Sequence, residues 1–242
     1  MSNILFIFEG EKTEQKITEN LTKYFINEHK NTIVTCAYCA EIYQLYNEIS
    51  QDIDLDTFTL LKRRPANEIT LEPYSRNDFA EIYMFFDYDG HSTLANDEKI
   101  EELLTVFNEE TEKGKLYINY PMVESLKHIN IEQNFKDSTV SAKENIKYKR
   151  LVDSEAENNY KQINSYTKEI WIELIELHIK KANFIINNDY LIPESNLTQY
   201  LIFKSQFEKY IKINNSIAVL NSFPLFLLDY YGINFISNLL RK

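Results

Sequence analysis

The sequence has few of the residues that build linkers and fibrous repeats, and few positive charges. Four glycines and five prolines in 242 residues exclude collagen, linker arrays and Gly/Ser tracts. Lys and Arg number 26 against 37 Asp and Glu, a net charge of −11, so bulk charge does not favour coating of nucleic acid. Cleavage of nucleic acid stays open, provided that metal ions neutralise an acidic site.

Long apolar runs are also missing. The run Ile4–Phe8 has no basic residue before it and meets Glu9 at once, which does not fit a secretory signal. The run Phe223–Leu228 stops at Asp229, far short of the ~20 apolar residues of a membrane span. We therefore expect a cytoplasmic protein without a membrane partner.

What the chain does contain is a large apolar fraction and an uneven charge. Hydrophobic residues make up 44% and aromatic residues 14%, which excludes a disordered chain. Residues 1–130 carry 12 basic and 24 acidic side chains, whereas residues 131–242 carry 14 and 13. The first part should attract a divalent cation, and the second should repel a polyanion less.

Residues 1–130 alternate between apolar strands and amphipathic helices, which predicts an α/β domain with a parallel sheet flanked by helices. Gly114 is expected to cap the third helix, and Pro121 to open a helix that carries Glu124 and His128. The expected strands are Ile4–Phe8, Thr32–Thr35, Glu81–Phe86 and Leu116–Tyr120, and the expected helices are Thr13–Asn27, Ala40–Ile49 and Asp97–Lys113.

The pattern changes after about residue 130, where three long stretches fit helices and no strand is expected. They are Ser154–Asn187, Glu194–Ile211 and Ile217–Tyr231. We interpret residues 1–130 as an α/β catalytic domain. Residues 131–242 are then a helical domain that offers a substrate or partner surface.

Acidic residues follow three of the expected strands. Glu9 ends the first, Asp87 and Asp89 end the third, and Glu124 lies in the turn after the fourth. The carboxyl ends of parallel strands form the functional edge of such a sheet, where a few carboxylates suffice for Mg²⁺. Each acid could instead belong to a turn or a helix cap. The neighbouring Gly10 and Gly90 favour a ligand or a tight catalytic turn.

These segments resemble the Toprim family. Ile4–Glu14 is similar to its opening strand, which ends in Glu-Gly, and Phe85–Asp89 to its Asp-x-Asp motif. The Glu-Gly-x-x-Thr-Glu opening and Tyr120–Glu124 resemble RloB-like and OLD-related Toprim proteins of bacterial anti-phage defence. Tyr120 stands where those proteins have Asn.

The resemblance implies a Mg²⁺- or Mn²⁺-dependent endonuclease. Glu9 would be general acid/base or metal ligand, Asp87 and Asp89 metal ligands, and Glu124 a ligand or the group that orients water. Glu14 would assist, or would be a solvated acid in the first helical turn.

The same resemblance implies partners. The substrate would be DNA or RNA, including transfer RNA, and the protein would be a toxin-like effector working with a partner ATPase. A homo-oligomer is left open.

Two other interpretations stay open. Met84–Ser92 also fits the opening of haloacid-dehalogenase-type phosphohydrolases, with Asp87 as nucleophile. Against it, neither Gly114 nor Gly232 is followed by the Asp that those enzymes need downstream. A catalytically inactive scaffold that binds a partner is the second alternative.

Basic, aromatic and thiol groups complete the candidates. Lys147, Lys149 and Arg150, with Tyr148 between them, are typical of a surface that binds a nucleic-acid backbone, or of a solvated face. His91 could contact phosphate, and His128 could support Glu124. A second basic cluster is Lys62, Arg63 and Arg64. Three further aromatic residues could stack bases or form core: Tyr160, Tyr166 and Trp171. Cys36 and Cys39 form a Cys-x-x-Cys motif that is expected at the start of a helix.

Overall fold

The structure is a computed structural model of the chain, and it describes residues 2–26, 32–39, 42–51, 55–88, 97–130 and 134–241. The chain divides into two compact units. The first comprises Met1–Phe86 and Glu98–Tyr117, and the second comprises Asp87–Asp97 and Ile118–Lys242. The chain thus passes between the units three times, at residues 86/87, 97/98 and 117/118, whereas the sequence predicted a single boundary near residue 130.

The first unit is built on a five-stranded sheet with the order β2-β1-β3-β5-β4. β1 runs parallel to both β2 and β3, and β4 runs antiparallel to β5. The strands are β1 (Ser2–Phe8), β2 (Thr32–Tyr38), β3 (Phe79–Asp87), β4 (Asn108–Glu109) and β5 (Gly114–Asn119). The predicted α/β fold with a mostly parallel sheet is therefore confirmed.

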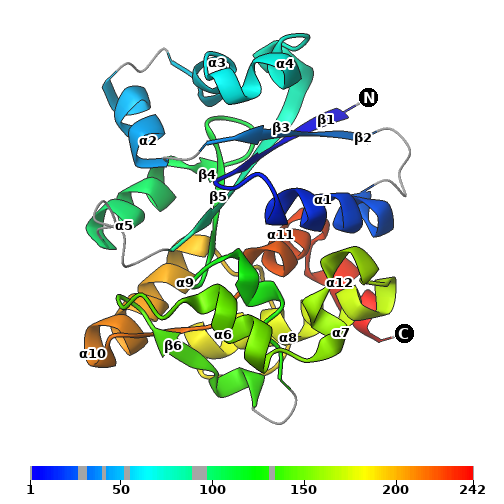
Figure 1. Ribbon diagram of the computed structural model, residues 1–242, viewed down its shortest axis with the longest axis vertical. Helices are drawn as coiled ribbons and strands as arrows, with labels where there is room; N and C mark the ends of the chain where they lie inside the picture. Colours follow the sequence, from blue (N-terminus) through cyan, green and yellow to red (C-terminus); the bar gives the residue numbers. More distant parts are fainter. Residues whose placement is uncertain are drawn as a thin grey trace. The chain divides into compact units, whose positions relative to one another are not determined.

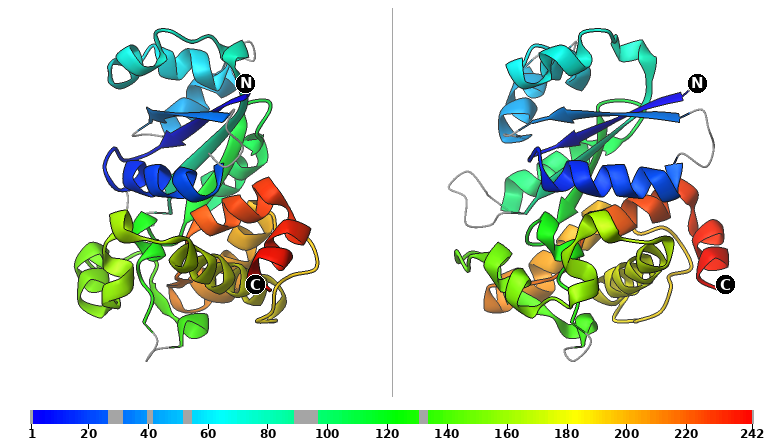
Figure 2. Two further views of the ribbon diagram at one scale, coloured as in Figure 1. Left: turned by 90° about the vertical axis from the view of Figure 1, so that its right-hand side faces the viewer. Right: turned by 45° about the vertical axis from the view of Figure 1, so that its right-hand side comes forward.

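Helices cover this sheet, with α1 on one side and α3 and α4 on the other (Figures 1 and 2). Every residue of Ile4–Phe8 is buried, as expected for a strand covered on both faces. The rings of Phe6, Phe8 and Phe85 meet at centroid distances of 5.2 to 6.1 Å. The helices are α1 (Thr13–Tyr24), α2 (Ile42–Gln51), α3 (Thr57–Lys62), α4 (Glu68–Leu71) and α5 (Asp97–Val106).

The second unit is mainly helical, as predicted for the C-terminal region, and also contains a two-stranded antiparallel sheet that the sequence did not predict. Its longest helix, α8 (Lys168–Asn187), contacts α9, α11 and α12 (Figure 2). The remaining elements are β6 (Thr139–Ser141), β7 (Ser216–Ala218), α6 (Tyr148–Glu155), α7 (Asn158–Lys161), α9 (Gln199–Gln206), α10 (Lys212–Asn214), α11 (Ser222–Tyr231) and α12 (Ile233–Leu240).

Several predicted helices are wrong in extent. The helix predicted over Asp97–Lys113 ends at Val106, and the chain then forms the β4–β5 hairpin. Gly114 is not a helix cap: it begins β5 at a φ of +106°, where Ile82 and Met84 leave little room for a side chain. Glu124 lies in a short 3₁₀ turn, Val123–Leu126, instead of the α-helix predicted after Pro121.

The long helices predicted in the C-terminal region are interrupted. The stretch Ser154–Asn187 is divided among α6, α7 and α8, and Glu194–Ile211 begins its helix only at Gln199. Within Ile217–Tyr231, the first residues belong to β7, and α11 starts at Ser222. The side chains of Thr167, Thr198 and Asn221 cap α8, α9 and α11 by accepting hydrogen bonds from backbone N–H groups.

Candidate functional site

Asp87 is the last residue of β3, and a buried asparagine fixes its side chain. Asp87 Oδ1 accepts a hydrogen bond of 3.1 Å from Nδ2 of Asn119, which ends β5. The amide oxygen of Asn119 accepts from the backbone N–H and the hydroxyl of Ser222, at 3.1 and 2.8 Å. Those two donors orient the amide so that its NH₂ group faces the Asp87 carboxylate.

Glu124 is a buried carboxylate, with 3% of its surface exposed. Its Oε1 lies 3.4 Å from Nζ of Lys149, whose side chain is mostly exposed. Its Oε2 is buried and has no hydrogen-bond partner among the described residues. A buried carboxylate oxygen without a partner is costly, so this atom indicates a place for a ligand.

Tyr148 is linked through a histidine to a third acid, Glu155. The Tyr148 hydroxyl lies 2.9 Å from Nδ1 of His128, and Nε2 of His128 lies 2.9 Å from Oε2 of Glu155. Since a carboxylate only accepts, Nε2 carries the ring hydrogen. In the neutral imidazole, Nδ1 then accepts from the tyrosine.

The charges around Tyr148 show which carboxylates share its surroundings. Burial raises the pKa of the Tyr148 phenol well above its ordinary value, and the negative charges of Glu124, Asp87 and Glu155 raise the pKa further. The Tyr148 phenol therefore keeps its proton at neutral pH.

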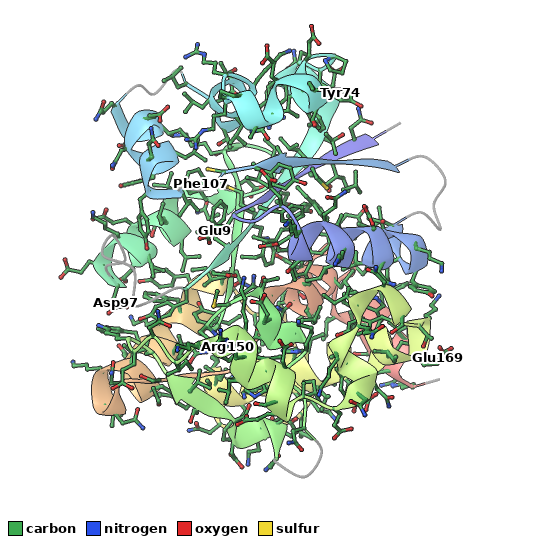
Figure 3. The ribbon with its side chains drawn as sticks, in the orientation of Figure 1. Glu9, Tyr74, Asp97, Phe107, Arg150 and Glu169 are labelled. Carbon is green, nitrogen blue, oxygen red and sulfur yellow. The ribbon has the colours of Figure 1, made fainter. Side chains whose placement is uncertain are left out.

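A cavity of about 280 Å³ lies beside Tyr148, and the predicted basic residues line it. Lys147, Lys149 and Arg150 belong to the start of α6 and are exposed. Arg150 is labelled in Figure 3. Lys147 has a left-handed backbone, with a φ of +52°, which is uncommon for lysine. Three cations thus border an open cavity whose wall includes the tyrosine beside Glu124.

Glu9 and Glu14 belong to the first unit. Glu9, labelled in Figure 3, follows directly on Phe8, which pairs with Phe85 of β3. Glu14 is buried and not solvated, with 5% exposed surface. Both of its carboxylate oxygens lie 3.0 Å from where a Cβ on Gly10 would stand. What approaches the Gly10 backbone here is therefore the Glu14 carboxylate.

Two predicted site residues, Asp89 and His91, lie outside the described residues, as does Gly90. Within the described ranges, no group of three or more His, Cys, Asp or Glu side chains could hold a metal ion. The described acids near Tyr148 nevertheless fit a Mg²⁺ ion in part. Glu124 has a buried oxygen without a described partner, and Mg²⁺ keeps several waters, so few carboxylates are needed.

Of the other candidates, the basic residues Lys62 and Arg64 contact neighbouring groups of the protein, and the aromatic residues are buried. Lys62 Nζ donates to the carbonyl oxygens of Glu72 and Tyr74, and Arg64 lies 3.8 Å from Glu48. The stacking role considered for three aromatic residues is wrong, because they form buried core: Tyr160, Tyr166 and Trp171.

The Cys-x-x-Cys context was also predicted wrongly. Cys36 lies inside β2, opposite Phe6, because β2 continues to pair with β1 as far as Tyr38. The helix after it begins only at Ile42. Burial, with a smaller effect of Glu19, raises the pKa of the Cys36 thiol to about 12, which opposes a reactive thiolate.

Sequence reasoning missed Asn119 and Glu155. Asn119 is a polar residue that ends an apolar strand one position before Tyr120, a signal that was visible. Glu155 follows Tyr148 by seven residues, two helical turns, and so shares a face of α6 with it. That spacing became informative only once α6 was known to start at Tyr148.

Comparisons with protein-family models, curated proteins and solved structures found no match. None of the helices in the described ranges combines the length and the apolar character that crossing a membrane requires. The resemblance to Toprim proteins, and the metal-site residues that it implies, therefore stay predictions.

Proposed function

We propose that this protein is a Toprim-type, Mg²⁺- or Mn²⁺-dependent nuclease that hydrolyses phosphodiester bonds of DNA or RNA. The observation that carries the proposal is the buried Glu124 carboxylate, whose Oε2 has no hydrogen-bond partner among the described residues. A buried carboxylate oxygen without a partner is costly, and a bound cation would remove that cost.

The metal would be held by Asp87 and Glu124, together with Asp89 and Glu9 as the resemblance implies. The chemistry supplied by bound Mg²⁺ or Mn²⁺ is activation of the attacking water and stabilisation of the leaving oxygen. Glu9 belongs to the first unit, and its role as general acid/base, like the assistance from Glu14, rests on the resemblance alone.

The surrounding side chains have distinct tasks in this proposal. Asn119 orients the Asp87 carboxylate through a hydrogen bond of 3.1 Å. Lys149 offsets the charge of Glu124 while the metal is away. Tyr148, held by His128, stays protonated and offers a neutral surface to the charged substrate. Lys147 and Arg150 contact phosphates of the nucleic-acid backbone.

We further propose, on the resemblance, that the nuclease is the effector of an anti-phage system and acts with a partner ATPase. Within a cell, such a partner would restrain the nuclease or deliver it to its target. Co-purification with the neighbouring gene product tests this part separately from catalysis.

The test of the nuclease is removal of its carboxylates. Asp87→Asn with Asp89→Asn, and separately Glu124→Gln, should abolish Mn²⁺ binding measured by calorimetry and lower the cleavage rate by more than about 100-fold, since even loss of an outer partner of a metal ligand costs about 10- to 100-fold. Asp153→Asn, which removes an exposed acid from α6, is the matched control and should behave as wild type. Wild-type cleavage by the double variant would place the site elsewhere.

The phosphohydrolase alternative predicts a different outcome. It requires a phospho-aspartate at Asp87, which beryllium fluoride would trap, and release of phosphate from small esters. The nuclease forms no such intermediate and should lose activity in Glu9→Gln. Full activity of Glu9→Gln together with trapping at Asp87 would favour the phosphohydrolase.

A further inference from the structure

The cavity beside Tyr148 has a composition that the cleavage chemistry does not require. Its walls include Met122 from the loop after β5, Ala142 and Ile146 from the segment before α6, and Tyr148 itself. Met122 and Ile146 also pack against the apolar cluster around Tyr148 and Val152. A site that held nothing but backbone phosphates would need no apolar wall.

The same cavity is also lined by charged and hydrogen-bonding residues. Lys147, Lys149 and Arg150 line it and carry exposed cationic groups. Ser141 and Asn145 add hydrogen-bonding groups to the lining. Glu144 adds one carboxylate to the lining, against the three cations. A ligand that satisfies the apolar wall, the hydrogen-bonding groups and the excess of positive charge has a flat apolar body with polar edges and at least one negative charge, which is the chemistry of a nucleotide.

The volume of the cavity limits the size of the ligand that it can hold. A volume of about 280 Å³ is close to the lower end of small-ligand sites, about 300–1,000 Å³, and suits a single base with its sugar. A base inside a duplex is stacked and paired, so it cannot occupy such a cavity without leaving the helix. The ligand is therefore an unpaired nucleotide.

Two residues connect the cavity with the carboxylates. Lys149 lines the cavity and lies 3.4 Å from Oε1 of Glu124. Tyr148 lines it too, and its hydroxyl lies 2.9 Å from Nδ1 of His128, which in turn meets Glu155. A nucleotide seated in the cavity would place an adjoining phosphate near Lys149, next to the proposed metal ligands.

We propose that this cavity binds the base of one unpaired nucleotide of the substrate strand, so that the enzyme acts on single-stranded or looped nucleic acid. The inference rests on the proposed nuclease function, which it deepens by naming the substrate class. The same chemistry could be met by a free mononucleotide, and the experiment distinguishes the two sources.

The first measurement uses wild-type protein in EDTA, where binding is observed without cleavage. Fluorescence anisotropy compares a 12-nucleotide thymidine strand, a 12-nucleotide strand of abasic spacers and a blunt duplex. Affinity for the abasic strand and for the duplex should be about tenfold lower than for the thymidine strand, because base stacking is lost. Equal affinity for the thymidine and abasic strands would overturn the proposal, since their phosphates are the same.

The second measurement fills the cavity. Ala142→Leu should weaken binding of the thymidine strand by about tenfold and leave binding of the abasic strand unchanged. The matched control is Ala66→Leu at an exposed position, which should bind as wild type. Unchanged binding by a folded Ala142→Leu variant would contradict the proposal. Should that variant not fold, the comparison of strands on wild-type protein decides alone.

The third measurement separates a strand from a free nucleotide. Adenosine and thymidine monophosphate should displace the labelled strand from wild-type protein. A mononucleotide that binds without displacing the strand would overturn the assignment to the substrate. Because all three measurements are made without metal, their failure is distinguishable from loss of cleavage in the Asp87 and Glu124 variants.

Discussion

The two units bury different kinds of side chain. The sheet of the first unit packs aromatic and aliphatic residues such as Phe6, Phe8 and Phe85 against one another. The second unit buries more polar and ionisable groups, among them His128, His178 and Lys181, than the first, where Glu14 and Asn67 are buried. Burying such groups costs free energy unless they are hydrogen-bonded. The second unit is therefore held to a larger extent by hydrogen bonds, and the first largely by packing.

This difference affects which unit can supply the residues of a binding or catalytic site. A mostly apolar core offers few groups for binding or proton transfer, whereas a buried polar network fixes charged side chains in defined positions. The hydrogen bonds from Asn119 to Asp87, from Ser222 to Asn119 and from His128 to Glu155 lie within the second unit. The first unit supplies the strand that ends at Asp87.

The largest loss of stability in this comparison of the two units is expected from a substitution in the core of the first unit. Phe6→Ala removes a fully buried ring that meets three others, so it should lower the free energy of unfolding by about 3–5 kcal/mol. Urea denaturation measures the loss. A loss below about 1 kcal/mol would mean that this sheet is not held by its aromatic packing.

An intermediate effect is expected from the polar network. Asn119→Ala removes one hydrogen bond from Asp87 and the acceptor of both Ser222 donors, which should cost about 1–3 kcal/mol. It should also weaken Mn²⁺ binding, because Asp87 loses the group that orients it. Ser222→Ala, which removes one of these hydrogen bonds, is the milder companion. If Asn119→Ala binds Mn²⁺ as wild type does, the asparagine has a structural role alone.

The third effect concerns pH, and it is the smallest when counted per pH unit. Burial lowers the pKa of His178 from 6.5 to about 3, and its Nδ1 accepts a hydrogen bond from the N–H of Asn221. Between these two pH values the unfolded chain therefore binds a proton at His178 that the folded chain does not bind. The free energy of unfolding falls as the pH falls from about 6.5 towards 3, by up to about 1.4 kcal/mol per pH unit.

A variant isolates this contribution. His178→Asn keeps an acceptor but cannot titrate, so its unfolding free energy should fall less steeply over the same pH range. Urea denaturation at several pH values measures both slopes. Equal slopes in variant and wild type would show that His178 is not the group responsible.

Much of the first unit could be predicted from the sequence, because its elements follow simple periodicities. The continuous apolar run Ile4–Phe8 predicts a strand covered on both faces, and this is confirmed. The hairpin after α5 was missed because residues 107–113 continue an acidic, helix-compatible pattern. Long-range hydrogen bonds hold these residues in the hairpin: the N–H of Ile82 donates to the carbonyl of Glu110, and Arg76 donates to the carbonyls of Thr111 and Glu112.

The candidate site was harder to predict than the fold. Glu124 and Asp87 stand out as acids that follow strands, and Lys147, Lys149 and Arg150 as a basic run. Their supporting partners do not stand out. The bond from Asn119 to Ser222 spans 103 positions, and no local pattern carries such a pairing. Residues that orient others are found by tertiary contact, which one sequence does not reveal.

The bond between Asn119 and Ser222 has a consequence for how this protein can be divided or recombined. Asp87 is positioned by Asn119, and Asn119 is in turn held by the first residue of α11. A fragment that stops at residue 130 would contain the acidic residues but not the hydroxyl that anchors their asparagine. The C-terminal helices are therefore not an interchangeable module, and a chimaera that replaces them must reproduce this anchor.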